Sequence, residues 1–246
     1  MSRVLCWFSA GAASAVATKL AIAEHGDRVV VASIDPGSEH PDNERFRDEC
    51  AEWFGQEVVL LKSEKYADTW AVWEARRYIV GPSGAPCTGE LKKKLRYSFE
   101  LPDDEQVFGY TSEEESRAER FREQNPGLTL LTPLIDRGLT KQDCLAMIAR
   151  AGIEIPEMYK LGYRNNNCIG CVKGGMGYWN KIRDDFPEVF QRMALLERDI
   201  GAAINRDKGK KVFLDELQIG RGHYPSELAP DCGVLCQIAE MELDAE

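Results

Sequence analysis

Short apolar runs alternate with amphipathic stretches along the first 150 residues. Val4–Phe8 is a continuous apolar run, as expected of a buried parallel strand. Ala12–His25 carries apolar residues at helical spacing and ends before Gly26, so it predicts a helix. Further strands are expected at Val29–Ile34, Glu57–Leu61, Gln106–Tyr110 and Leu128–Leu131, and further helices at Asp42–Phe54, Glu113–Glu123 and Lys141–Ala151. Strands alternating with helices predict an α/β fold, in which helices flank a twisted parallel sheet with right-handed crossovers.

The pattern changes after about residue 151. Ile155–Cys171 is rich in turn residues, Met176–Asn205 is mostly helical in pattern, and Tyr224–Cys236 is punctuated by proline and glycine. We therefore predict one α/β domain over residues 1–155. A cysteine-bearing, mostly helical C-terminal extension and tail would follow over residues 156–246.

The charge balance limits the classes of partner. The chain has 31 basic and 41 acidic side chains and a formal charge of −10, so a general nucleic-acid binder is disfavoured by phosphate repulsion. No apolar run approaches the roughly 20 residues that a membrane span needs. Met1–Phe8 runs directly into a strand pattern without the features of a secretory signal. We expect a cytoplasmic protein without a membrane partner.

A loop of small residues joins the first strand to the first helix. Ser9, Ala10, Gly11 and Ser14 would let the backbone approach a ligand closely, and the helix would present unpaired N–H groups to a phosphate. A tight turn with a serine cap would need the same residue types. The loop by itself leaves both interpretations open.

The eight cysteines fall into two groups. Cys6, Cys50 and Cys144 lie inside apolar patterns and are expected in the core. The others lie in turn-rich segments, where metal ligands and nucleophiles are usually displayed, at Cys87, Cys168, Cys171, Cys232 and Cys236. Zinc would take the last four of these cysteines, whereas a [4Fe–4S] cluster would take the first three with a fourth cysteine or an open iron.

Several segments, in the right order, resemble a known family. Ser9–Ser14 resembles the SGGxxS-type PP-loop of the adenine nucleotide alpha-hydrolase-like superfamily, which includes the phosphoadenylyl-sulfate reductase family. Asp35–Glu39 resembles the Asp-Thr-Gly segment of these reductases, and Gly109–Arg117 resembles their Gly-x-Arg-x-x-Glu-Ser-x-Arg stretch. With Pro133–Asp136 and a later Leu-Gly-Tyr turn, the resemblance covers most of positions 4–172.

The resemblance implies a sulfonucleotide reductase-like enzyme with an adenine nucleotide next to a [4Fe–4S] cluster. The nucleotide would be adenylyl sulfate (APS), phosphoadenylyl sulfate (PAPS) or ATP. Its implied contacts are the loop residues above together with Asp35, Gly37, Ser116, Arg117 and Arg120. The implied cluster ligands are Cys87, Cys168 and Cys171, with Cys236 as a candidate for the fourth.

Two implied catalytic groups complete the site. Cys232 lies in an Asp-Cys-Gly-Val tail similar to the tail whose cysteine attacks the sulfate sulfur in the reductases, so the resemblance implies a nucleophile there and a thioredoxin-type reductant as partner. Lys92 follows Cys87 and would lie near both cluster and phosphates. A homo-oligomer is compatible with the sequence.

Two departures from the family pattern keep alternatives open. Ala13 occupies a position where many ATP-cleaving relatives carry an aspartate, which favours reductase chemistry. Thr111 replaces an arginine that contacts the anionic substrate in the reductases. That change, with the single Cys87, favours an ATP-dependent sulfur-insertion enzyme acting on a nucleic acid. A nucleotide or redox sensor is a third alternative.

Overall fold

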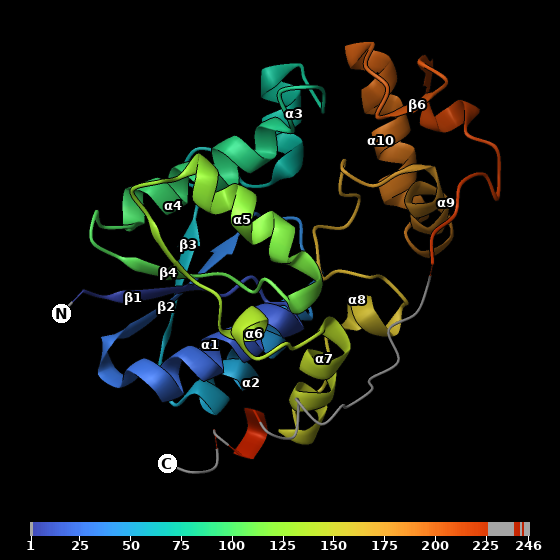
Figure 1. Cartoon of the computed structure of the whole chain (residues 1–246). Helices are drawn as coiled ribbons and strands as arrows, with labels where there is room; N and C mark the ends of the chain where they lie inside the picture. Colours follow the sequence, from blue (N-terminus) through green and yellow to red (C-terminus); the bar gives the residue numbers. More distant parts are fainter. Residues whose placement is uncertain (1, 226–238, 242, 244–246) are drawn as a thin grey trace.

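Five parallel strands form the central sheet of the protein (Figure 1). The computed structural model describes residues 2–225, 239–241 and 243. The strands are β1 (Val4–Trp7), β2 (Val29–Asp35), β3 (Val58–Lys62), β4 (Glu105–Val107) and β5 (Thr129–Leu131). The α/β fold and the parallel sheet predicted from the apolar pattern are thus confirmed.

The strand order in the sheet is β3-β2-β1-β4-β5. The chain starts at the middle strand, builds outward to β3, then crosses back to place β4 on the other side of β1. The loops after β1 and β4 therefore leave the sheet in opposite directions. In open α/β sheets this reversal creates the crevice at the carboxyl ends of the strands in which ligands bind.

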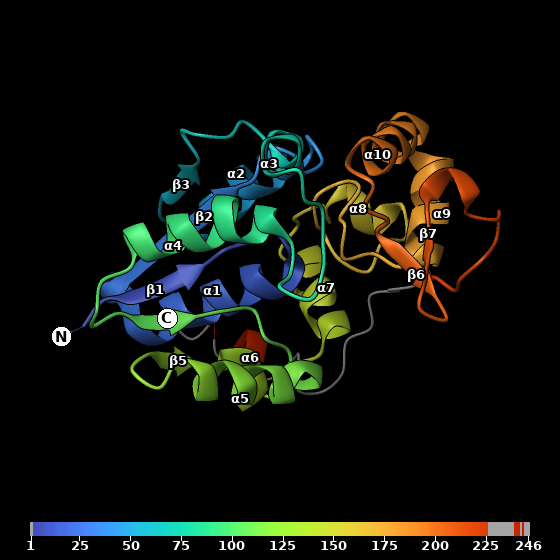
Figure 2. The ribbon, with the colours of Figure 1, turned by 90° about the horizontal axis from the view of Figure 1, so that it is seen from above.

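One face of the sheet packs against helices that surround α1. This helix (Ala12–His25) is buried along Val16 and Leu20 and lies between β1 and its helical neighbours. The neighbours are α2 (Asn43–Phe54), α6 (Pro133–Asp136) and α7 (Lys141–Arg150). Figure 1 shows α1 and α6 on the opposite side of the sheet from α4, and Figure 2 looks onto the side that α4 covers. Cys6, Cys50 and Cys144 are fully buried here, which confirms their prediction as core residues.

The other face is covered by α4 (Lys94–Phe99) and α5 (Glu115–Gln124). Phe108, just after β4, belongs to the apolar clusters of both helices, where it packs near Phe99 and against Phe121. The strand expected at Gln106–Tyr110 ends earlier, at Val107. The last residues of that apolar run fill the gap between helices and strand rather than extending the ladder, which a period-based prediction cannot distinguish.

A second apolar core lies beyond the carboxyl ends of the strands. It joins α3 (Thr69–Arg76) to the C-terminal part of the chain, and its largest fully buried side chains are Trp73 and Trp179. The other elements of this part are α8 (Glu157–Lys160), α9 (Met176–Asp185), α10 (Pro187–Ile200), β6 (Asn205–Asp207) and β7 (Lys210–Val212). Figure 1 shows α9 and α10 side by side, away from the sheet. Among the described residues, no helix is both long and apolar enough to cross a membrane.

Candidate functional site

The loop after β1 is held in shape by the Ser14 side chain. Ser14 Oγ donates to the carbonyl oxygen of Gly11 at 2.9 Å and accepts from the backbone N–H of Ser9 at 3.1 Å. The hydroxyls of Ser9 and Ser14 are also 3.1 Å apart. Ser9 is exposed, whereas Ser14 is buried. The predicted phosphate loop therefore has one buried hydroxyl that holds the loop together and a second hydroxyl, on exposed Ser9, that is bonded to the first.

Ala10 adopts a backbone conformation that alanine rarely takes. Its φ is +53°, and its side chain is fully buried. A left-handed conformation costs a residue with a Cβ about 1–2 kcal/mol. Such strain persists only where the surroundings hold it in place, and it is concentrated at functional sites.

Asn166 supplies part of that restraint. Its Nδ2 donates to the carbonyl oxygen of Ala10 at 2.5 Å and to Asn43 Oδ1 at 2.7 Å, and the side chain is buried. The hydroxyl of Tyr159 lies beneath the same loop, 3.4 Å from the Ala12 N–H. The segment that precedes Cys168 is thus bonded directly to the loop after β1.

The loop after β4 approaches the start of α1 at Gly109, a residue that has no side chain. A Cβ on Gly109 would lie 2.5 Å from the backbone nitrogen of Ser14 and 2.8 Å from the carbonyl carbon of Ala13. Contacts this short do not occur for real Cβ atoms. Gly109 is therefore what lets β4 and the start of α1 come together at the crevice.

Asp35 and Gly37 form a tight turn at the end of β2. Asp35 Oδ1 accepts from the Gly37 N–H at 2.8 Å, and its other oxygen pairs with Lys62 Nζ at 2.9 Å. Burial alone would raise the pKa of Asp35, but Lys62 and the Gly37 N–H lower it below its ordinary value. Gly37 has a φ of +70°, and a Cβ there would overlap the carbonyl of Ala67. Asp35 thus remains ionised and shapes this turn.

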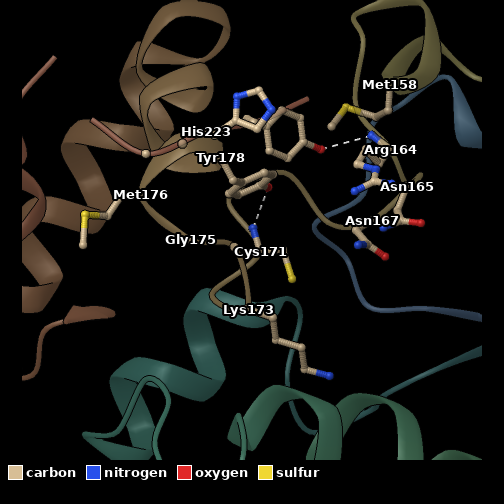
Figure 3. Close-up of a pocket in the computed structure, with 14 residues that line it drawn as sticks. Met158, Arg164, Asn165, Asn167, Cys171, Lys173, Gly175, Met176, Tyr178 and His223 are labelled. Atoms are coloured by element: carbon tan, nitrogen blue, oxygen red, sulfur yellow. Dashed lines mark hydrogen bonds between the residues drawn. The ribbon is translucent and has the colours of Figure 1, made fainter. Parts of the chain in front are cut away.

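Cys168 and Cys171 lie on a loop that is fixed from both sides. The Ile169 N–H donates to the carbonyl of Ser38 at 2.9 Å, which ties the loop to the turn after β2. Tyr178 Oη accepts from the Cys171 N–H at 2.9 Å, as Figure 3 shows, and lies 3.4 Å from the Cys168 carbonyl. The backbone of this Cys-x-x-Cys loop is therefore held independently of what its sulfurs bind.

Cys87 reaches the same region from a different part of the chain. It immediately precedes η2, a π-helix over Thr88–Lys93 that lies next to β2. π-helical turns are rare and occur often at functional sites. Cys87, Cys168 and Cys171 are half-buried free thiols.

Lys92, on η2, interacts electrostatically with all three of these thiols. Burial alone would lower the pKa of its ammonium, but the nearby sulfurs and the Glu39 carboxyl raise it above its ordinary value. Burial raises the pKa of Cys168 to about 12, and the Lys92 charge opposes that shift. Cys87 and Cys171 also pack against the same apolar core, so the structure places the three cysteines near one half-buried cation.

Trp73 adds a donor at the edge of this group. Its Nε1 is buried and has no hydrogen-bond partner among the residues the structure describes. The indole nevertheless lies close enough to the Cys87 thiol to oppose, in part, the rise in pKa that burial causes. An orphaned N–H beside a cysteine sulfur fits a sulfur-bound group that accepts hydrogen bonds.

Within the described part of the chain, no three or more histidine, cysteine or acidic side chains are arranged around a position for a metal ion. A single zinc ion needs all its sulfurs about 2.3 Å from one centre. A four-iron cluster binds each thiolate at a different iron, so its ligands stand farther apart. The sulfurs here come from two separate segments, Cys87 before η2 and the Cys168–Cys171 loop, which suits the wider spacing of a cluster better.

The remaining predicted residues are placed less centrally or lie outside the described residues. Ser116 is exposed on α5, Arg117 pairs with Glu114 and stacks over the Tyr110 ring, and Arg120 is exposed and bonds to the backbone of its own helix. Cys232 and Cys236 lie outside the described residues.

The sequence analysis missed three residues of this site, Asn166, Tyr159 and Lys141. Burial lowers the pKa of Lys141 to about 8, and its Nζ donates to Asn165 Oδ1 at 2.6 Å. The run of three asparagines before Cys168 was a visible signal, because buried amides need partners. Nothing in the sequence pattern marked the other two.

Comparison with known proteins does not identify the chain. No protein-family model matches the sequence, and no curated protein matches it.

Proposed function

We propose that this chain is a sulfonucleotide reductase-like enzyme of the phosphoadenylyl-sulfate reductase family. An adenine nucleotide would lie over Ser9–Ser14 at the switch between β1 and β4. A [4Fe–4S] cluster would be held by Cys87, Cys168 and Cys171. The observation that carries the proposal is the convergence of these three thiols on Lys92, in a loop system bonded to the carbonyl of Ala10.

Each group has a role that follows from its position. Backbone N–H groups at the start of α1 would bind the nucleotide phosphates, as helix N-termini do. Lys92 would stabilise negative charge between phosphates and sulfurs. A cluster at this position would supply a redox-sensitive centre next to the nucleotide. The fourth iron would be left open or bound by Cys236.

The chemical step would be performed by the Cys232 thiolate. Its attack on the sulfate sulfur of the nucleotide would form a thiosulfonate on Cys232 and release the adenine nucleotide phosphate. A thioredoxin-type dithiol would then reduce the thiosulfonate, releasing sulfite and leaving an oxidised disulfide on the reductant. Ala13 supports this assignment because it provides no carboxylate for the magnesium of an ATP-cleaving site.

The test begins with anaerobic purification, an absorbance spectrum and an iron count. We expect a brown protein with about four irons per chain. Cys171→Ser should lose this iron, whereas Cys50→Ser, a change of the same kind in the α2 core, should retain it. A colourless protein containing one zinc would contradict the cluster. Sulfite release from adenylyl sulfate that disappears in Cys232→Ser would support the reductase.

One observation favours a second candidate, an ATP-dependent enzyme that inserts sulfur into a nucleic acid. Thr111 stands where the reductases carry a substrate-binding arginine, and it is buried, 3% exposed, at the start of a short 3-10 turn. Arg117, the next cation along, is engaged by Glu114. The Cys232→Ser experiment separates the two candidates when ATP is also supplied, because pyrophosphate release without sulfite would support sulfur insertion.

A further inference from the structure

A cavity of about 570 Å³ lies beside the Cys-x-x-Cys loop (Figure 3). Its walls come from residues 164, 165 and 167, from the segment that runs from Cys171 into the first turn of α9, and from residues 222–224. Gly177 and Gly222 meet backbone to backbone in the wall, where neither could carry a Cβ. The volume is typical of sites for small molecules.

The charge of the cavity is opposite to that of the protein. Arg164, Lys173 and His223 line it, and among the described residues no aspartate or glutamate does. Among the residues that the structure describes, neither the Arg164 guanidinium nor the Lys173 ammonium has an ion-pair partner. The chain as a whole carries ten more acidic than basic side chains. Unpaired cations in a concave wall attract and concentrate anions.

The hydrogen-bonding groups left free in the cavity are mostly donors. Tyr178 Oη is already used by the Cys171 N–H and the Cys168 carbonyl, and Tyr224 Oη accepts from the Arg164 N–H at 3.0 Å. Asn165 Oδ1 accepts from Lys141, whereas no hydrogen bond within the described residues uses its amide N–H groups. A ligand with several acceptor oxygens would satisfy this set of groups.

Sulfur atoms make up part of the remaining wall. Cys171, Met158 and Met176 line the cavity, and Figure 3 shows the Cys171 side chain directed away from the Tyr178 hydroxyl that holds its backbone. Thioether and thiol sulfurs are polarizable and accommodate soft atoms. We propose that this cavity binds a small oxyanion of sulfur or phosphorus, such as thiosulfate or phosphate, next to Cys171. This is a second site, separate from the nucleotide loop after β1.

The test uses the full chain as purified anaerobically. Thiosulfate and inorganic phosphate are titrated separately by calorimetry, which identifies the oxyanion. In parallel, lysines are acetylated at low reagent dose with and without each anion, and the products are mapped by mass spectrometry. We expect the bound oxyanion to reduce the labelling of Lys173, while Lys210, an exposed lysine on β7, remains unprotected.

Charge-removing variants locate the site. Arg164→Gln and Lys173→Gln should each weaken binding by about fivefold, the size expected when one cation a few ångströms from an exposed anion is removed. Lys210→Gln removes the same charge away from the cavity and should leave the affinity unchanged. Both cavity side chains are exposed, so unfolding curves should match the wild type.

Three results would overturn the proposal. One is that neither oxyanion binds in the millimolar range. A second is binding that survives both cavity substitutions, which would assign the anion to the loop after β1. A third is protection of Lys173 by a single-stranded oligonucleotide but by neither small oxyanion, which would make the cavity part of a nucleic-acid surface. Iron content and sulfite release report on the proposed function separately, so its failure would be distinguishable from failure here.

Discussion

Replacing Gly109 by alanine tests the geometry of the crevice most directly. The added Cβ would lie 2.5 Å from the Ser14 nitrogen, whereas ordinary contacts begin at 3.4 Å, so backbone must move by about 0.9 Å. All three nearest atoms belong to the backbone of Ala13 and Ser14, so no side chain can rotate away. Overpacking of this kind costs about 1–3 kcal/mol. For a chain of this size, that corresponds to a fall in Tm of about 2–12 °C.

The same displacement would move the loop that we propose binds the nucleotide. A misplacement of about 1 Å in a positioned site can lower the rate of the reaction there by up to about 100-fold. We therefore expect Gly109→Ala to bind adenylyl sulfate or ATP at least tenfold more weakly. Thermal unfolding measures the first effect and calorimetric titration with each nucleotide measures the second.

Gly127→Ala is the matched control, because that glycine is exposed and an added Cβ would meet nothing within 4 Å. It should leave Tm and nucleotide affinity within error of the wild type, or raise Tm slightly. Wild-type stability in Gly109→Ala would refute the packing argument. A destabilised Gly109→Ala that binds nucleotide normally would instead show that the nucleotide does not use this loop.

Two further predictions concern Asp104, just before β4, and Ala10, in the loop after β1. Burial alone would raise the pKa of Asp104, but hydrogen bonds from Arg3 and from the Leu101 N–H lower it below the ordinary value of 3.8. The ionised carboxylate therefore stabilises the folded state fully above pH 3.8, and this stabilisation is lost as the pH falls through the pKa of Asp104 in the folded protein. Asp104→Asn should therefore lower the free energy of unfolding in urea by about 2–3 kcal/mol at pH 7 and by distinctly less near pH 3. An equal loss at the two pH values would contradict the lowered pKa. Ala10→Gly should change stability by less than about 1 kcal/mol, because relief of the left-handed strain offsets the lost methyl burial, whereas Ala10→Val should cost about 2 kcal/mol or more in the same assay. Equal stability of the two variants would show that Ala10 is not strained.

The elements of the sheet followed closely from the apolar pattern, and the exceptions have physical causes. The helix expected at Ala12–His25 has those bounds in the structure, because a long amphipathic stretch with a terminal glycine specifies its own ends. The π-helix Thr88–Lys93 was not predicted, since it has no apolar periodicity and buries little beyond Leu91. The bounds of the helix Thr69–Arg76 were not predicted, because its two tryptophans pack into a core built largely from residues after 150.

The sequence alone predicts the α/β class, the five strands of the central sheet, most helices and the candidate ligands at Cys87, Cys168 and Cys171. Local periodicity and residue chemistry are properties of short segments, which is why they can be recognised without the fold. Which of these segments meet depends on the folded arrangement of the whole chain. Lys92 stands near thiols from two segments, Asn166 bonds to Ala10, and a cation-lined cavity opens beside Cys171. All three depend on contacts between residues about 60 to 155 positions apart. Such contacts follow from strand order and from the packing of two cores, which no short stretch of sequence encodes.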